Sequence, residues 1–188
     1  MIDLELNSSK DLKREGKSFY WASFFLPKNS KKKAGILYSI CRYFDDIADK
    51  YSEDQTDYLK DTIEEIKKNK NNKVNIFLQK SKINKSIFID LIEGLILDQQ
   101  KIRIQNKEEL IKYSYHVAGT VGLMMSKIIG VKNKEAAKSA IDLGIGMQLT
   151  NIARDVHEDS KMKRIYLPAN WIPNISLKNL NNLNEFSS

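Results

Sequence analysis

The chain of 188 residues has one cysteine, three prolines and eight glycines. Because Cys41 has no second thiol in the chain to pair with, no intrachain disulfide can form, and we expect a reducing, cytoplasmic compartment. The apolar residues around Cys41 predict a buried packing thiol rather than a nucleophile. Proline and glycine are the residues that most often form turns and interrupt helices, so their scarcity favours an all-α protein.

The chain also lacks the apolar run of about 18 residues or more that a membrane-spanning helix needs. Residues 1–13 are polar and mixed in charge, which is unlike a signal peptide. Basic residues are spread along the chain without the aromatic interleaving of a nucleic-acid module, so no nucleic-acid partner is expected.

Basic residues outnumber acidic ones by 31 to 24, which gives a formal net charge of +7. The simpler interpretation is a solvated surface rich in lysine. The other is attraction to polyphosphate substrates or to an anionic membrane, with the protein peripheral on its inner face. The charge alone leaves both open.

Helical periodicity runs through nearly the whole chain and predicts a single domain over residues 1–188. The expected helices cover about residues 9–25, 31–51, 52–68, 74–81, 85–100, 107–129 and 133–160. Asn29 and Ser30 offer an N-cap for the second of these. The connector 101–106 and a loose, polar, asparagine-rich tail over 173–188 complete the predicted organisation.

Two pairs of aspartates with the same spacing are the most informative pattern. Asp45 and Asp49 form the first pair, and Asp155 and Asp159 form the second. Residues at i and i+4 share one helix face, where like charges repel by a few tenths of a kcal/mol. Carboxylate oxygens suit hard cations such as Mg²⁺. The pattern therefore predicts two facing acidic helices that clamp a metal–phosphate group.

The first pair ends a polar stripe that begins with Tyr38 and Arg42. Arg42 lies one turn before Asp45, so it suits an intrahelical ion pair. Its planar guanidinium equally suits bidentate contact with phosphate. The sequence leaves both roles open.

The second pair ends a longer stripe of Gly144, Gln148 and Asn151. These residues precede Asp155 and Asp159 at helical spacing, so amide and carboxylate oxygens form one column. Gly144 and Gly146 each cost about 1 kcal/mol of helix propensity against alanine. We expect them to permit close approach of another helix or of a ligand.

Several blocks in order resemble the squalene/phytoene synthase family of head-to-head isoprenoid synthases. They are Ser18–Pro27 (SFYWASFFLP), Tyr38–Asp49, Gly94–Asp98, Tyr113–Gly122, and Gln148–Asp159 followed by Arg164–Pro168 (RIYLP). The last block is the most specific. The resemblance covers roughly residues 15–172.

The resemblance implies an all-α isoprenoid synthase bundle with a central cavity, which joins two prenyl diphosphates and requires Mg²⁺. Metal would be held by Asp45, Asp49, Asn151, Asp155 and Asp159. The catalytic set would be Asp45, Asp49, Asp155, Asp159 and Tyr166. Substrate would contact Ser18, Phe19, Tyr38, Arg42, Tyr113, Gln148 and Arg154. His116 and His157 are expected neither to bind metal nor to act as bases. Within the family, the overall pattern favours a phytoene synthase-like member, and the sequence leaves farnesyl and geranylgeranyl diphosphate both open as the substrate.

The carbocation formed by such chemistry needs a dry cavity with aromatic walls. The small residues Ala118, Gly119 and Gly122 fit either room for a prenyl chain or tight helix packing. The family is typically longer, so this chain is expected to be C-terminally truncated, with an open apolar wall. An inactive fragment and a non-catalytic assembly factor of the same superfamily are the alternatives. A plain lysine-rich interaction protein does not explain the ordered blocks.

Overall fold

The computed structural model describes residues 17–49, 54–99 and 103–172. The elements, in order, are α2 (Lys17–Ala22), the 3₁₀ turn η1 (Ser23–Phe25), α3 (Lys28–Ala48), α4 (Thr56–Lys67), α5 (Lys73–Lys80), α6 (Lys85–Asp98), α7 (Lys107–Ser114), the π-helical η2 (Tyr115–Gly119), α8 (Thr120–Ile128), α9 (Lys134–Arg154) and α10 (Val156–Lys161). Within these ranges every regular element is a helix, and the β-type pairing is an isolated parallel bridge between Arg103 and Ile165. The all-α prediction is confirmed.

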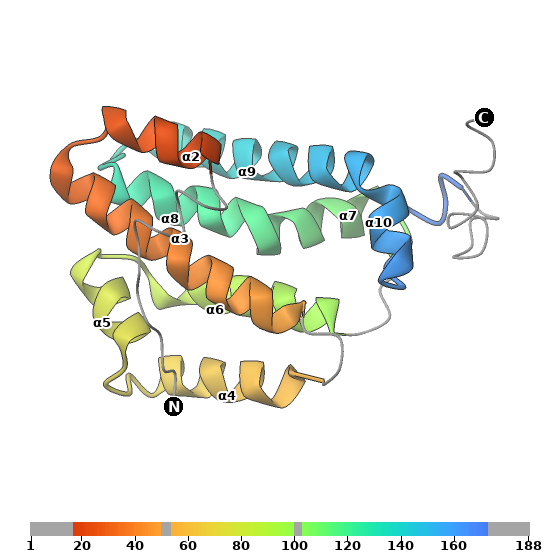
Figure 1. Ribbon diagram of the computed structural model, residues 1–188, viewed down its shortest axis with the longest axis horizontal. Helices are drawn as coiled ribbons and strands as arrows, with labels where there is room; N and C mark the ends of the chain where they lie inside the picture. The colour runs from red at the N-terminus through yellow and green to blue at the C-terminus, as the bar shows by residue number, and fades with distance from the viewer. Residues whose placement is uncertain (1–16, 50–53, 100–102, 173–188) are drawn as a thin grey trace.

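The helices lie roughly along one direction in layers (Figure 1). α3 and α6 pack together in the middle, α4 packs on α6, and α9 packs on α8 and η2. The main core lies between α3, α4, α6 and α8, where Phe44 and Phe88 meet edge to face at 5.6 Å. No helix in the described ranges combines the length and apolarity needed to cross a bilayer.

Asparagine side chains begin four of the helices. Asn72, Asn84, Asn106 and Asn133 accept hydrogen bonds from backbone N–H groups in the first turns of α5, α6, α7 and α9. Each satisfies a donor that the helix itself leaves unpaired. The asparagines between the lysine-rich segments therefore have a structural function as caps.

The start of α3 differs from the prediction. The helix begins at Lys28, directly after Pro27, whose φ of −55° suits entry into a helix. Ser30 lies inside the first turn, where its hydroxyl donates to the carbonyl of Ile128 at 3.1 Å. The predicted cap at Asn29–Ser30 is therefore wrong. The predicted residues 9–16, 50–53, 100–102 and the tail 173–188 lie outside the described residues.

The predicted helix over 107–129 continues from α7 to α8 through the π-turn η2. Tight contacts explain its small residues: a Cβ on Gly122 would collide with the carbonyl of Ala140 in α9, and Gly119 faces Ile141 and Ile145. The structure thus favours helix packing over room for a prenyl chain at these glycines.

Gly144 lies across the same contact, where a Cβ would collide with the carbonyl of Ala118. The expectation of close approach is therefore confirmed for Gly144. At Gly146 no helix approaches, because a Cβ there would meet nothing within 4 Å, so close approach of a ligand stays a prediction at that position.

A second, smaller core lies where the chain returns from α10. Tyr113 and Tyr166 pack there with Ile104, Leu110 and Ile152. The segment after α10 is held beside the connector before α7 by hydrogen bonds from Ala169 N to the Ile104 carbonyl (2.9 Å) and from Asn170 N to the Gln105 carbonyl (3.1 Å). These bonds fix the segment that carries Arg164 and Tyr166.

Candidate active site

Four carboxylates from distant segments approach one another at one end of the bundle. Asp45 and Asp49 lie at the end of α3, Asp98 is the last residue of α6, and Asp159 lies on α10. In Figure 1 this is the end at which α3 and α6 stop beside α10. The two acidic motifs predicted to face each other are therefore brought to the same end of the bundle. We call this end the acidic pole (Asp45, Asp49, Asp98 and Asp159).

Arg164 joins these segments. Its guanidinium donates to Asp49 Oδ1 at 2.9 Å and to the carbonyls of Ala48 (3.3 Å) and Asp98 (3.4 Å). The arginine side chain is only 9% exposed. Carbonyls at helix C-termini carry partial negative charge, so one buried cation stabilises the ends of α3 and α6 together.

Asp98 is the acceptor for two tyrosines. The hydroxyl of Tyr113 donates to its two carboxylate oxygens at 2.9 and 3.1 Å, and the hydroxyl of Tyr166 donates to Oδ1 at 2.8 Å. The two rings stack with centroids 4.9 Å apart. Burial nevertheless raises the pKa of Asp98 to about 6, because desolvation outweighs the favourable effects of Arg164 and the tyrosine hydroxyls.

Asp45 and Asp159 are also poorly disposed to carry charge. Burial raises the pKa of each to about 6, and the neighbouring carboxylate of its own motif, Asp49 or Asp155, raises it further. The charge of Asp98 adds to both shifts. The two motifs therefore interact electrostatically through Asp98, and negative charge is in excess at this pole.

Arginines pair with the aspartates of both motifs. Arg42 contacts Asp45 at 3.1 Å and Asp46 at 2.8 Å, so the intrahelical ion pair considered from the sequence is present. Arg154 binds Asp155 through two donors at 2.6 and 2.7 Å and holds the pKa of that carboxyl below its usual value. With Arg164 on Asp49, each motif has a guanidinium within reach.

The second motif departs from the predicted continuous helix. α9 ends at Arg154, and Asp155 has φ −100° and ψ 16° between α9 and α10. The backbone bonds from Asp155 to Asn151 and from Asp159 to Asp155 persist at 2.8 Å. Figure 1 shows α10 running at an angle to α9, so the oxygens from Gln148 to Asp159 do not form one straight column.

The remaining predicted residues have different surroundings. Phe19 of α2 approaches Tyr38 of α3, with ring centroids 6.4 Å apart. Gln148 is half-buried on α9, whereas Asn151 and Arg154 are exposed. Ser18 lies in α2. The rings of Phe19 and Tyr38 therefore lie close enough to line one side of a substrate site together.

Donor chemistry at the pole suits a hard cation, because carboxylate and amide oxygens are the groups such ions prefer. Over the described ranges, however, no three histidine, cysteine, aspartate or glutamate side chains are grouped closely enough to hold a metal. The predicted ligands thus lie at one end of the bundle, but in the described residues their side chains are too far apart to coordinate a single ion. The oxygen donors and the excess negative charge fit a divalent cation.

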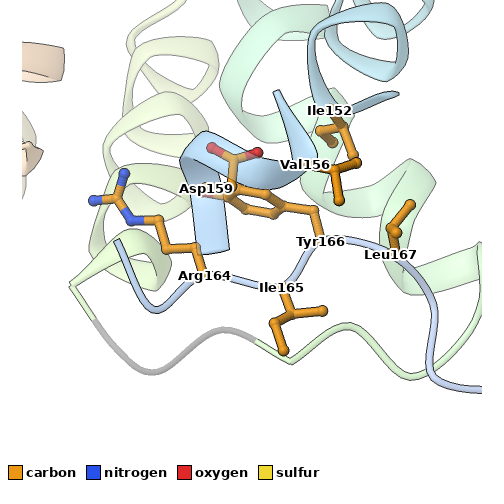
Figure 2. Close-up of a pocket in the computed structure, with 7 residues that line it drawn as sticks. All are labelled: Ile152, Val156, Asp159, Arg164, Ile165, Tyr166 and Leu167. Atoms are coloured by element: carbon orange, nitrogen blue, oxygen red, sulfur yellow. The ribbon is translucent and has the colours of Figure 1, made fainter. Parts of the chain in front are cut away.

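A small pocket opens beside this pole and is lined by Ile152, Val156, Asp159, Arg164, Ile165, Tyr166 and Leu167. Figure 2 shows the side chains of Arg164 and Tyr166 on the extended segment after α10, with Asp159 on the helix above them. Charged and apolar groups meet in this pocket, whose volume of about 10 Å³ leaves room for about one water molecule. The larger central cavity stays a prediction.

Asp98 and Arg164 are site residues that sequence reasoning did not single out. Both lie in blocks that carried the resemblance, but neither belongs to a pair of like charges at i and i+4 such as the pairs that marked the two motifs. In the sequence, Asp98 could be noticed only as the acid that follows the apolar residues 95–97. Arg164 could be noticed only as the arginine before Ile165 and Tyr166. Their importance comes from contacts 66 residues apart in the chain.

Known proteins resemble the chain along most of its length. The family profile described as squalene/phytoene synthase matches residues 12–183. A 15-cis-phytoene synthase of Paracoccus sp. is 31% identical over 189 aligned positions, covering 92% of this chain and 62% of the relative. A phytoene synthase of Thermus thermophilus is 34% identical over 168 positions, covering 84% and 56%.

The fold agrees with these similarities. A crystal structure of a dehydrosqualene synthase in complex with ligand superposes with a TM-score of 0.78 at 30% identity, covering 92% of this chain and 64% of that one. The predicted isoprenoid synthase fold is confirmed. The chain spans about three fifths of the length of the curated relatives it matches.

Proposed function

The chain belongs to the squalene/phytoene synthase family, and we propose that it acts in the head-to-head condensation of two prenyl diphosphates to a phytoene- or squalene-type hydrocarbon. The observation that carries this proposal is the meeting of both acidic motifs around Arg164 at one pole of the bundle. A diphosphate is the ligand that such a mixture of carboxylates and guanidinium groups suits best, provided that a cation bridges them.

The residues that would hold Mg²⁺ are Asp45, Asp49, Asn151, Asp155 and Asp159. When bound, the ion would supply the positive charge that stabilises a departing diphosphate. The excess of negative charge that raises the pKa of Asp45 and Asp159 supports this assignment, because a cation would relieve it.

Guanidinium groups would bind the diphosphate directly. Arg42 and Arg154 are paired with aspartates that sit at the surface of the pole, and a planar fork of donors binds phosphate as well as carboxylate. We infer that the two arginines move between these partners when substrate arrives. Gln148, six residues before the end of α9, would add a neutral donor.

Buried groups would orient the site rather than react. Asp98 fixes the hydroxyls of Tyr113 and Tyr166, and their stacked rings form a rigid wall behind Asp159 and Arg164. Aromatic faces stabilise cationic carbon, and a dry wall keeps water from it. Phe19 and Tyr38 would extend this wall along α3 toward the prenyl chain.

Thermal unfolding with ligand tests the proposal. Mg²⁺ together with farnesyl or geranylgeranyl diphosphate should raise the melting temperature of the chain, and Asp45→Ala or Asp155→Ala should remove the rise. Asp142→Ala is the matched control, because Asp142 is an exposed carboxylate on α9 away from the pole. The absence of a rise in the unmutated chain would refute the site assignment.

Extraction of hydrocarbon product separates catalysis from binding. A product with 30 carbons from farnesyl diphosphate, or 40 carbons from geranylgeranyl diphosphate, would support the enzyme and identify its substrate. Ligand-induced stabilisation without any product would support the inactive fragment or the binding-only relative instead.

A further inference from the structure

Three aromatic side chains are exposed at the corner where α2 and η1 turn into α3. Trp21 is 70% exposed, Phe24 53% and Phe25 91%. The rings touch one another: Trp21 and Phe24 have centroids 5.8 Å apart, and Tyr20 and Phe24 have centroids 5.0 Å apart. A contiguous cluster of large rings in water marks an interaction surface.

The same segment is strongly basic. Residues 17–33 contain five lysines and neither aspartate nor glutamate. The ammonium of Lys31 lies 3.7 Å from the centre of the Phe24 ring, and Lys28 and Lys32 are exposed beside it. Positive charge and aromatic surface therefore belong to one patch, which we name the aromatic–lysine corner (Trp21, Phe24, Phe25, Lys28, Lys31 and Lys32).

Neighbouring elements extend the positive charge. The hydrogen bond from Ser30 to the Ile128 carbonyl places the end of α8, with the exposed Lys127 and Ile129, next to the corner. On its other side Lys33 donates to the carbonyl of Lys80 at the end of α5, at 3.4 Å. Three helix ends thus present lysines together.

The corner and the acidic pole lie at opposite ends of α3. The helix rises 1.5 Å per residue, so Lys28 and Asp45 are separated by roughly 26 Å. Figure 1 shows the start of α3 beside α2 and its far end near α10. The protein therefore has one basic, aromatic end and one acidic end, and an anionic surface would attract only the first.

We propose that the aromatic–lysine corner docks the protein on an anionic lipid surface. Tryptophan and phenylalanine rings bind at the boundary between headgroups and acyl chains, and lysines beside them bind lipid phosphates. Charge complementarity selects this partner, because an apolar protein partner would not require a segment without acids. Because this surface is separate from the acidic pole, an experiment can refute the lipid-binding proposal without refuting the proposed catalytic function, and the reverse also holds.

Vesicle sedimentation of the full chain tests the proposal. Binding to vesicles of equal phosphatidylglycerol and phosphatidylcholine should be at least about tenfold stronger than to pure phosphatidylcholine, since each lysine near an anionic surface contributes about fivefold. Binding should fall as salt rises, because screening weakens the attraction. The salt series needs no variant and so does not depend on correct folding of one.

Two variants locate the surface. Lys28→Glu/Lys31→Glu/Lys32→Glu and Trp21→Ser/Phe25→Ser should each lower binding to the anionic vesicles about tenfold or more. The matched controls are Lys60→Glu/Lys112→Glu, two exposed lysines elsewhere, and Leu143→Ser, which is 66% exposed on α9. The controls should bind like the unmutated chain.

Three results would overturn the proposal. They are no binding of the unmutated chain to anionic vesicles, unchanged binding of both corner variants, and an equal loss in the controls. Self-association that the corner variants abolish, without lipid binding, would instead make the corner an interface between copies and would also reject the lipid assignment.

Discussion

The guanidinium of Arg164 donates to the carboxylate of Asp49 at 2.9 Å and thereby joins residues 115 positions apart. The contact links the first acidic motif to the segment that follows the second. Because the arginine is buried, water solvates its charge poorly, and Asp49 and the two helix-end carbonyls supply compensating negative charge. The pair therefore stabilises the pole on which the proposed chemistry depends.

Replacing Arg164 by methionine should lower the free energy of unfolding by roughly 1–3 kcal/mol, because it removes a buried cation that donates to the half-exposed Asp49 and to the carbonyls of Ala48 and Asp98. Urea denaturation measures the change. The exposed pair Lys138–Glu135 gives the control, and Lys138→Met should change stability by less than about 0.5 kcal/mol. An equal, small effect of both changes would contradict a structural role for Arg164.

The pKa of Asp98 predicts how stability depends on pH. The folded-state pKa of about 6 is above the ordinary value of 3.8, so the folded protein binds this proton more tightly than the unfolded chain. Stability should therefore rise as pH falls from about 7.5 to 5, with Asp45 and Asp159 acting in the same direction.

Asp98→Asn should reduce that rise, because asparagine does not titrate and still offers one oxygen to the tyrosine hydroxyls. Urea midpoints at pH 7.5 and pH 5 measure the difference. The exposed Asp142→Asn should keep the unmutated dependence. A rise that is as large in Asp98→Asn as in the unmutated chain would show that Asp98 does not cause it.

Two glycines in the same bundle should respond oppositely to alanine. Gly122→Ala should destabilise the protein by about 1–3 kcal/mol, because its Cβ would collide with the Ala140 carbonyl and push α8 from α9. Gly146→Ala should stabilise it by up to about 1 kcal/mol, since the site is open and alanine favours the helix. Thermal unfolding of both variants gives the comparison, and destabilisation by Gly146→Ala would contradict the described environment.

Cys41 should resist alkylation in the folded protein. Burial raises the pKa of its thiol to about 12, so little of the reactive thiolate forms at pH 8. Mass spectrometry after treatment with iodoacetamide should find little label in buffer and full label in urea. Rapid labelling of the native chain would show that the thiol is accessible.

The helices and both acidic motifs could be predicted from the sequence because they depend on local patterns. Apolar residues at helical spacing identify α3 and α6, and the aspartates at i and i+4 identify the motifs. The asparagines that cap α5, α6, α7 and α9 are a local signal of the same kind, whereas the cap predicted at Asn29–Ser30 was wrong. Such signals lie within one or two turns of the chain.

The contacts that complete the pole could not be predicted in this way. Asp98 and Arg164 matter through partners on other helices, and no local spacing identifies those partners. The break at Asp155 was missed because the aspartate spacing is compatible with a continuous helix. The bridge between Arg103 and Ile165 pairs two segments without strand alternation, so no pattern indicates it.

A double-mutant cycle between Asp45 and Asp155 tests the central claim, that both motifs serve one diphosphate ligand. Isothermal titration would measure binding of Mg²⁺ with a non-reactive thio-analogue of farnesyl diphosphate to the unmutated chain, Asp45→Asn, Asp155→Asn and the double variant. We expect that each single change weakens binding and that the two effects are not additive, with a coupling of about 1 kcal/mol or more. Additive effects, or undiminished binding in either single variant, would contradict a shared site.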